Sequence, residues 1–291
     1  MMYKFVDEQS ANHPVDLLCN TMEISRSAYY AYRKGDTFKI TEKRSVLLSE
    51  VKKVFNVHRK RYGSRRIKHE LHRQGIPIGR DKVRNLMKSQ NLVAIQPKSF
   101  VPKTTDSRHT LGYSQNVLAQ RGFPKRLDEA YVGDITYLPT TSGEWLYLMT
   151  WMDLCSRCIV GWKIEDHMED SLVIEALELA FAKRKPSPGL IVHTDRAGQF
   201  ASADFRYLLA SHQCIQSMSK ADNPYDNAYA ESLFSRFKAE LIQKGAFESK
   251  EDAIIEVFDY IEVYYNTQRL HSSLRYMPPQ EFENKIKQSK L

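Results

Sequence analysis

The second half of the chain alternates strand-like and helix-like segments, and this alternation restricts the possible folds more than any other feature. From residue 130 onward the order is strand, strand, strand, helix, strand, helix, strand, helix and helix, over AYVGDITYLP, EWLYLMTWMDL, CIVGWKIED, DSLVIEALELAFAKR, GLIVHTD, ADFRYLLASHQ, CIQSMS, NAYAESLFSRFKAELI and EDAIIEVFDYIEVYYNTQRLHSSL. Three strands in a meander, followed by alternating helices and strands, predict an α/β fold. The order matches the ribonuclease H-like layer architecture.

Three acidic residues occupy distinctive places in this frame. Asp134 falls on the first strand, Asp195 ends the fourth strand, and Glu231 falls near the start of the helix that follows the last strand. Ligand sites in such sheets lie outside the ends of the strands, where carboxylates from separate elements can converge. Because Mg²⁺ prefers carboxylate oxygens, the three residues could together hold the metal of a phosphoryl-transfer site.

Other acids compete with these three, because the chain contains 35 Asp and Glu in all. Asp153, Asp166 and Asp170 also follow or precede predicted elements, and Asp153 even follows an apolar strand. Asp222 and Asp226 could replace Glu231, although a loop position favours a capping role. Any one of these carboxylates alone is more often solvated or capping than catalytic.

The helix that contains Glu231 has a clear apolar stripe at the helical period. The stripe consists of Ala230, Leu233, Phe234, Phe237 and Leu241. Glu231, Ser235 and Lys238 lie to one side of it, each within a turn of the next. Lys238 is therefore expected on the same side of the helix as Glu231, where its cation could hold a phosphate or a terminal base of a DNA end.

The charge distribution favours a nucleic-acid partner for the front of the chain. Residues 1–130 hold 26 Lys and Arg against 12 Asp and Glu, whereas residues 131–291 hold 17 against 23. A basic half joined to an acidic half suits nucleic-acid binding in front of metal-dependent chemistry. With 291 residues, of which 42% are apolar, the chain can form two or three domains.

The basic half predicts an all-α helix-turn-helix region over residues 41–95, after a region of short helices over 1–40. Ser64 is expected to cap SRRIKHELHRQG, and the following helix RDKVRNLMKSQNL presents a basic and amide face. The candidate DNA-contact residues are Arg65, Arg66, Arg80, Arg84, Asn85 and Lys88. The alternative is that HRKRYGSRRIKH is only a solvated, charged helix end.

The remaining signals bound the organisation of the chain. Residues 96–127 are polar and proline-containing and predict a linker, which leaves 128–291 for the catalytic core and the C-terminal helices. The lone pair Cys155 and Cys158 lacks the partners of a zinc site, so ordinary thiols are expected. The opening MMYKFVDEQS is unlike a signal peptide, and no apolar run approaches the length of a membrane span, so a cytoplasmic protein is expected.

Several long motifs together resemble the transposases of bacterial insertion sequences in the large IS-three family. They are YGSRRIKHEL, RDKVRNLM, VGDITYL, DLCSRCIVGW, HTDRAGQF, SMSKADNPYDNAYAESLFSRFKAEL and YYNTQRLHSSLRYMPPQEF, in the same order and over nearly the whole chain. The resemblance is to the second-frame (OrfB) protein, which has a retroviral-integrase-like core. By position, the family's Asp-Asp-Glu triad falls on Asp134, Asp195 and Glu231, and its trailing basic residue falls on Lys238.

The resemblance implies a function and its partners. It implies an enzyme that cleaves at the terminal inverted repeats of its element and joins the 3′-hydroxyl to target DNA, with two Mg²⁺ ions, or Mn²⁺, as cofactors. A first-frame (OrfA) partner, a homo-oligomer on DNA and a place on the bacterial nucleoid are also expected. Ala197, Gly198 and Asp222 depart from the family's usual glycine, serine and glycine.

Two other functions stay open. The chain could be a sequence-specific DNA-binding regulator with a degenerate core, which would bind DNA without metal-dependent nicking. It could also be a structure-specific nuclease, which would cut DNA without joining it.

Overall fold

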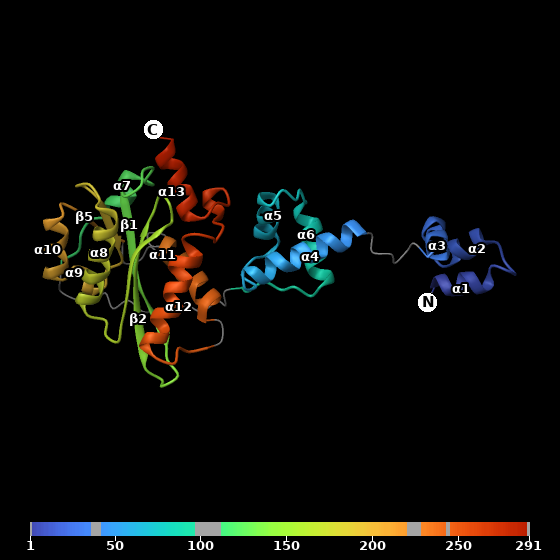
Figure 1. Cartoon of the computed structure of the whole chain (residues 1–291), viewed down its shortest axis with the longest axis horizontal. Coiled ribbons are helices and arrows are strands. Elements are labelled where there is room, and N and C mark those ends of the chain that lie inside the picture. The colour runs from blue at the N-terminus through green and yellow to red at the C-terminus, as the bar shows by residue number, and fades with distance from the viewer. Residues whose placement is uncertain (1, 36–41, 97–111, 220–227, 243–244, 290–291) are drawn as a thin grey trace.

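The computed structural model describes residues 2–35, 42–96, 112–219, 228–242 and 245–289; within these, the side chains of residues 42 and 228–232 are not described. Figure 1 shows three parts in chain order: a small helical unit, a second helical unit and a sheet with helices around it. Among the described residues, no helix combines the length and the apolar character needed to cross a bilayer.

The sheet contains the five predicted strands in the order β3-β2-β1-β4-β5. They are β1 (Ala130–Pro139), β2 (Trp145–Asp153), β3 (Ile159–Glu165), β4 (Ile191–Thr194) and β5 (Ile215–Met218). The first three pair antiparallel as the expected meander, while β4 pairs parallel to β1 and β5 parallel to β4. The predicted ribonuclease H-like α/β class is therefore confirmed.

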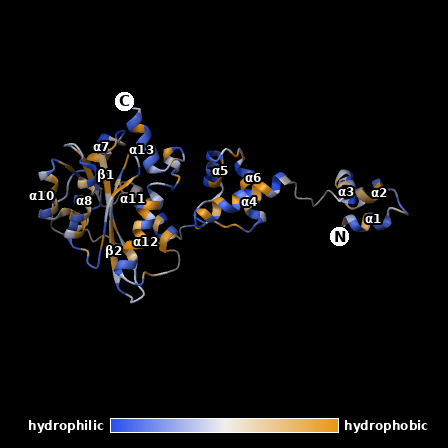
Figure 2. Ribbon diagram, viewed as in Figure 1, coloured by the Kyte–Doolittle hydropathy of each residue, from blue (hydrophilic) through white to orange (hydrophobic). Residues whose placement is uncertain are grey.

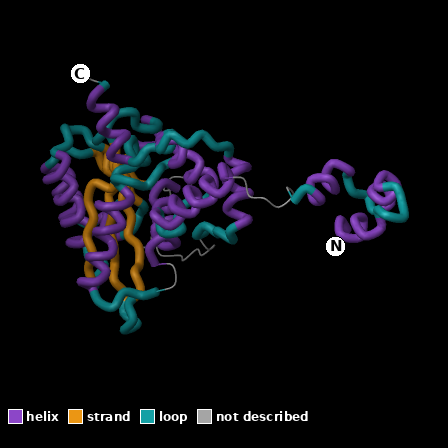
Figure 3. The backbone as a smooth tube through the Cα atoms, turned by 45° about the vertical axis from the view of Figure 1, so that its right-hand side comes forward, coloured by secondary structure: helices purple, strands orange, loops and turns teal. Residues whose placement is uncertain are grey.

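Helices cover both faces of this sheet, as Figure 3 shows. One face packs against α8 (Asp170–Arg184), α9 (Gly198–Ala201) and α10 (Ala203–Ser211), through a core that includes Trp151 and Phe205. Gly161 on β3 is required there, because a Cβ would collide with the backbone of α8 at Ala176 and Ala180. Figure 2 shows the apolar residues concentrated along β1 and β2 between the two layers.

The other face of the sheet packs against α11 (Ala228–Phe237) and the C-terminal elements. On β1, Val132 and Leu138 belong to this second core, whereas Tyr131 belongs to the α8 core. Since side chains alternate along a strand, the even-numbered residues 132–138 of β1 face α11. This alternation fixes the face on which Asp134 lies.

The C-terminal region differs from the single long helix that its sequence predicts. Helix α12 (Lys250–Phe258) passes into a π-helical stretch, η3 (Asp259–Tyr265), followed by a short 3₁₀ turn, η4 (Ser272–Leu274), and α13 (Pro279–Gln288). Helix α11 likewise continues as a π-helical turn, η2 (Lys238–Ile242). The predicted linker also contains one short helix, α7 (Val117–Arg121).

The expected helix-turn-helix region forms a three-helix unit of α4 (Glu42–Val57), α5 (Ser64–Arg73) and α6 (Arg80–Ser89). Ile67, Leu71 and Val83 are fully buried in its core. The expected Ser64 cap was wrong by one residue, because Gly63 occupies the cap position and makes no side-chain hydrogen bond.

The first described residues form a separate unit of α1 (Met2–Gln9), α2 (Val15–Thr21) and α3 (Arg26–Arg33). Its small core consists of Val6, Leu18, Cys19 and Tyr29.

Candidate active site

Asp134 on β1 and Asp195, just after β4, lie beyond a paired position of two neighbouring parallel strands. The register pairs Val132 of β1 with His193 of β4, and each aspartate lies two residues further along its own strand direction. Adjacent strands lie about 4.8 Å apart, and residues two apart share a face. Asp195 immediately follows β4, and both aspartates are half-buried, with Asp134 on the face of β1 that α11 covers.

Backbone groups orient both carboxylates. The N–H of Ile135 donates to Oδ1 of Asp134 at 2.8 Å, and the N–H of Ala197 donates to Oδ1 of Asp195 at 3.0 Å. The short segment after β4 thus fixes Asp195 through the backbone of Ala197, one of the two residues that depart from the family pattern there.

Lys238 lies close to Asp134, at the point where α11 becomes a π-helical turn. Burial lowers the pKa of the Lys238 ammonium, and the negative charge of Asp134 partly offsets that shift. Glu231 belongs to α11 by its backbone, two turns before Lys238, although its side chain is outside the described part of the chain. Residues seven apart lie on nearly the same side of a helix.

The competing acids have other surroundings. Asp153 is fully buried and accepts hydrogen bonds from Ser156 N at 2.8 Å, Ser156 Oγ at 2.6 Å and Asp128 N at 3.1 Å. Burial raises the pKa of Asp153 to about 6. Asp153 pairs with Tyr131 across the strands, so it lies on the α8 face, away from Asp134. It therefore holds the turn between β2 and β3.

Asp166 lies at the end of the outermost strand, beside Glu165 and His167. The ligating atoms of these three residues lie within 4.8 Å of one another. Glu165, however, already pairs with Lys163 at 3.4 Å and with Lys250. Asp170 lies in the first turn of α8, and Asp222 and Asp226 lie outside the described residues.

The predicted DNA-contact residues fall into two groups. Five are exposed on α5 and α6: Arg65, Arg80, Arg84, Asn85 and Lys88. Arg66 points instead toward the core, where its Nε donates to the carbonyl of Leu270 at 2.9 Å and its Nη1 lies 3.9 Å from Glu240. Burial lowers the pKa of Arg66, and its side chain is only 19% exposed.

Sequence reasoning missed a buried ionic cluster that follows Lys238. Arg269 donates to both oxygens of Glu240, at 2.8 and 2.6 Å, and Tyr260 Oη donates to Oε2 at 2.9 Å. The carbonyl of Glu240 accepts from Nε of Arg61, at 3.2 Å, in the helix-turn-helix unit. The motif RLHSSL contains Arg269, but its spacing gives no sign of a partner 29 residues earlier.

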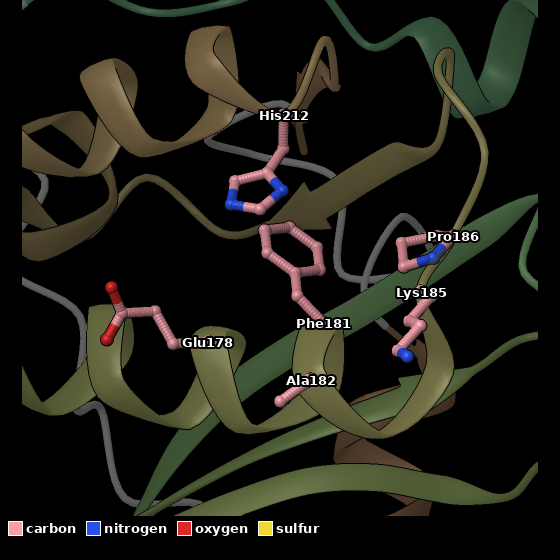
Figure 4. A pocket seen from close by; sticks show the side chains of 6 residues that line it. All are labelled: Glu178, Phe181, Ala182, Lys185, Pro186 and His212. Atoms are coloured by element: carbon pink, nitrogen blue, oxygen red, sulfur yellow. The ribbon is translucent and has the colours of Figure 1, made fainter.

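A surface hollow of about 490 Å³ lies apart from the acidic pair. It is lined by Glu178, Phe181, Ala182, Lys185, Pro186 and His212, and Figure 4 shows these side chains between the end of α8 and His212. Pro186 precedes β4, whereas Asp195 follows it, so the hollow lies at the opposite end of that strand.

Family comparisons match both the sheet and the second helical unit. A model described as integrase core domain matches residues 124–224, and a second model with the same description matches residues 212–279. A model described as HTH-like domain matches residues 42–100. The fold and these matches define the class: an integrase-type core behind a helix-turn-helix-like domain, in a DNA-cutting enzyme.

Full-length relatives identify the family. The transposase InsF of insertion sequence IS3A from Escherichia coli (strain K12) is 36% identical over 287 residues, covering 98% of this chain and 99% of that protein. The transposase of insertion sequence element IS904 from Lactococcus lactis is 39% identical over 240 residues, covering 82% of this chain and 94% of that protein. This chain belongs to the IS-three (IS3) family of insertion-sequence transposases, as its motifs predicted.

Solved structures with a similar arrangement are retroviral. One is the cryo-EM structure of a simian T-cell lymphotropic virus intasome in complex with a PP2A regulatory subunit, with a TM-score of 0.47 and 14% identity, covering 80% of this chain and 74% of that chain. Another is the HTLV-2 integrase catalytic core domain in complex with magnesium, with a TM-score of 0.42 and 13% identity, covering 54% of this chain and 96% of that chain.

Proposed function

We propose that this transposase binds the terminal inverted repeats of its own element, cleaves there, and joins the 3′-hydroxyl to target DNA in a metal-dependent reaction. One feature supports the proposal: Asp134 on β1 and Asp195, directly after β4, each lie two residues beyond Val132 and His193, which pair in the parallel register of these neighbouring strands. Glu231 on α11 is the proposed third carboxylate.

The donor set fits a hard divalent cation. The two aspartates supply only oxygen atoms, which suits Mg²⁺ or Mn²⁺ better than a soft metal. Half-burial limits competition from bulk water, and the backbone donors to Asp134 and Asp195 hold both carboxylates in place. When bound, two ions would activate the attacking oxygen and stabilise the leaving oxygen.

The remaining chemistry falls to residues of the chain that position DNA. Lys238, whose ammonium interacts with the charge of Asp134, is the proposed contact to a phosphate of the DNA end. In-line phosphoryl transfer needs no covalent protein intermediate, so no serine or tyrosine nucleophile is required.

The exposed face of α6 is the proposed site of end recognition. Arg80, Arg84, Asn85 and Lys88 face solvent together, and such side chains can contact base edges and phosphates. Arg65 is a further proposed contact, whereas we assign Arg66 to docking of the domain on the core.

We also propose the division of the chain and its partners. The division is a helical region over 1–40, a helix-turn-helix domain over 41–95, a linker over 96–127 and the core over 128–291. The partners are a first-frame (OrfA) protein or its frameshift fusion, and further copies of this chain assembled on DNA in the bacterial cytoplasm.

A strand-transfer assay tests this proposal. The full chain is incubated with Mg²⁺, labelled duplexes from the DNA flanking its own gene, and a target plasmid. We expect joined products from the wild type, and bound but uncut DNA with Glu231→Gln. Asp166→Asn, which removes an exposed acid at the end of β3, should retain the wild-type products.

The other outcomes separate the alternatives. Cutting without joined products would indicate a nuclease, and binding without cutting by the wild type would indicate a regulator. Cleavage at the wild-type rate by Glu231→Gln would exclude Glu231 as the third carboxylate.

A further inference from the structure

The first helical unit contains two helices joined by a short turn. Helix α2 ends at Thr21, four residues follow, and α3 begins at Arg26 with Ser25 as its cap, whose Oγ accepts the N–H of Ala28 at 3.1 Å. Glu23 in the turn has a φ of 51°, a left-handed conformation that lets the chain reverse between helices. Two short helices joined in this way, supported by a third, form the frame of helix-turn-helix DNA readers.

The packing leaves one face of α3 for a partner. Tyr29 is fully buried against Leu18 and Cys19, and Tyr32 stacks on Tyr3 of α1 with ring centroids 5.3 Å apart. The exposed residues of α3 are Arg26, Ser27, Tyr30 and Arg33, and Lys34 follows. They recur at the spacing of one helix face. Arginine, serine and tyrosine are residue types that contact phosphates and base edges.

Charge is segregated within this unit. Residues 24–35 contain three cations, Arg26, Arg33 and Lys34, and no acid. The acids lie on α1, α2 and the turn, and two of them form exposed ion pairs: Arg26 with Asp16 at 2.5 Å and Arg33 with Asp7 at 3.8 Å. Exposed pairs of this kind contribute at most about 1 kcal/mol, so a phosphate can replace the carboxylate.

We propose that α1–α3 is a second DNA reader, with α3 placed in the major groove of the duplex at the end of the element. It is separate from α6 and from the HTH-like match over residues 42–100. The proposal rests on the proposed function only in taking DNA as the partner. Gly35 and Glu42 are seven residues apart, so they can be separated by at most about 25 Å. The end of α3 therefore lies near the start of the helix-turn-helix unit, and we expect the two contacts on one stretch of DNA.

Matched substitutions in the full chain test this second reader. Arg26→Ala and Arg33→Ala each remove a cation from α3, and Lys4→Ala removes one from α1, where Lys4 is 76% exposed. The probe is the labelled duplex that flanks the gene, titrated at several salt concentrations and footprinted with hydroxyl radicals. Each arginine variant should bind several-fold more weakly, with the salt slope reduced by about one, whereas Lys4→Ala should match the wild type.

The footprint separates this proposal from the proposed function. The wild type should protect two adjoining patches, of which Arg33→Ala loses one and Arg84→Ala on α6 loses the other. A single patch lost only with Arg84→Ala would overturn the second reader and leave the proposed function standing, whereas no protection at all would remove both. Equal competition by duplex RNA would also overturn it, because the RNA major groove is too narrow for a helix.

Discussion

Lys238 is a residue on which burial and a neighbouring charge act in opposite senses. Burial lowers the pKa of its ammonium, and the carboxylate of Asp134 opposes that shift without cancelling it. A cation placed to hold a phosphate works only below its own pKa, so the direction of the shift has a functional consequence. The helical pattern predicted Lys238 on the same side of its helix as Glu231, but such a pattern alone gives no proximity to Asp134.

The loss of DNA-end binding at high pH, the alkaline limb of the binding curve, should therefore depend on Lys238. Binding by the wild type should fall at a lower pH than an ordinary lysine would allow, since the lysine loses its proton as the pH rises through the lowered pKa. Lys238→Arg keeps its charge and should move this limb to higher pH, because arginine stays protonated throughout. Fluorescence anisotropy of a labelled end between about pH 7 and 10 measures the effect.

Lys185→Arg is the matched control, since Lys185 is exposed at the far end of α8. It should leave the pH at which DNA binding is lost as it is in the wild type. If Lys238→Arg also leaves that pH unchanged, Lys238 does not hold the DNA end.

At the scale of elements, helix α11 and its π-helical continuation connect the candidate site to a buried ionic cluster. The turn from Lys238 to Ile242 follows α11 directly and places Glu240 opposite Arg269, each side chain 3% exposed. Wider helical turns of this kind are rare and frequently occur at functional sites. The apolar stripe predicted the helix correctly, but a period of 3.6 cannot show where the hydrogen bonding changes.

Glu240→Ala should strongly destabilise the protein, because Arg269 would be left buried without a counter-charge. Breaking such a pair from one side costs about 3–5 kcal/mol. Urea unfolding followed by tryptophan fluorescence measures the loss. The double variant Glu240→Leu with Arg269→Leu should recover part of it, since Arg269 is then no longer a buried charge without a partner, although Arg66 still loses the Glu240 carboxylate.

Glu8→Ala provides the comparison, because it removes one partner of an exposed pair with Lys4, 4.0 Å apart. Its cost should stay below about 1 kcal/mol. If Glu240→Ala cost no more than Glu8→Ala, the cluster would not be a source of stability.

The C-terminal elements show a further limit of sequence patterns. The apolar residues between 251 and 274 predicted one long helix, yet the helical stretch ends at Tyr265, and His271 has an extended backbone with φ −107° and ψ 122°. The buried tyrosines at 260, 264 and 265 pack against the sheet and against the helix-turn-helix unit. These contacts join segments about 200 residues apart, and no local pattern contains that information.

At the scale of the whole molecule, the helix-turn-helix unit docks on the C-terminal part of the core. Tyr62 Oη accepts the N–H of Leu270 at 2.7 Å, and Arg73 pairs with Glu281 at 2.7 Å. The apolar residues of both parts form one continuous cluster. Because of this docking, one predicted DNA contact has another role. Arg66 lies on a basic helix, but its side chain donates to the carbonyl of Leu270.

The succession of strands and helices along the chain and the class of fold could be predicted, because periodicity and short connections are local properties. The meeting of Asp134 and Asp195 at one site stays a prediction from that succession and the family motifs, and the register of β1 with β4 up to Val132 and His193 agrees with it. The rival Asp153 could be separated from them only in three dimensions, where alternation places it on the α8 face. The docking of the helix-turn-helix unit on the core could not be predicted either, because it depends on contacts between segments far apart in the sequence.

Iron-directed cleavage of the protein tests whether Asp134, Asp195 and Glu231 share metal ions. Fe²⁺ exchanged into the site of the full chain, with ascorbate and peroxide, cuts the backbone beside the bound metal. We expect fragments that end near residues 134, 195 and 231, are suppressed by excess Mg²⁺ and are lost in Asp134→Asn. Cleavage confined to residues 165–167, where Glu165, Asp166 and His167 lie together, would contradict it.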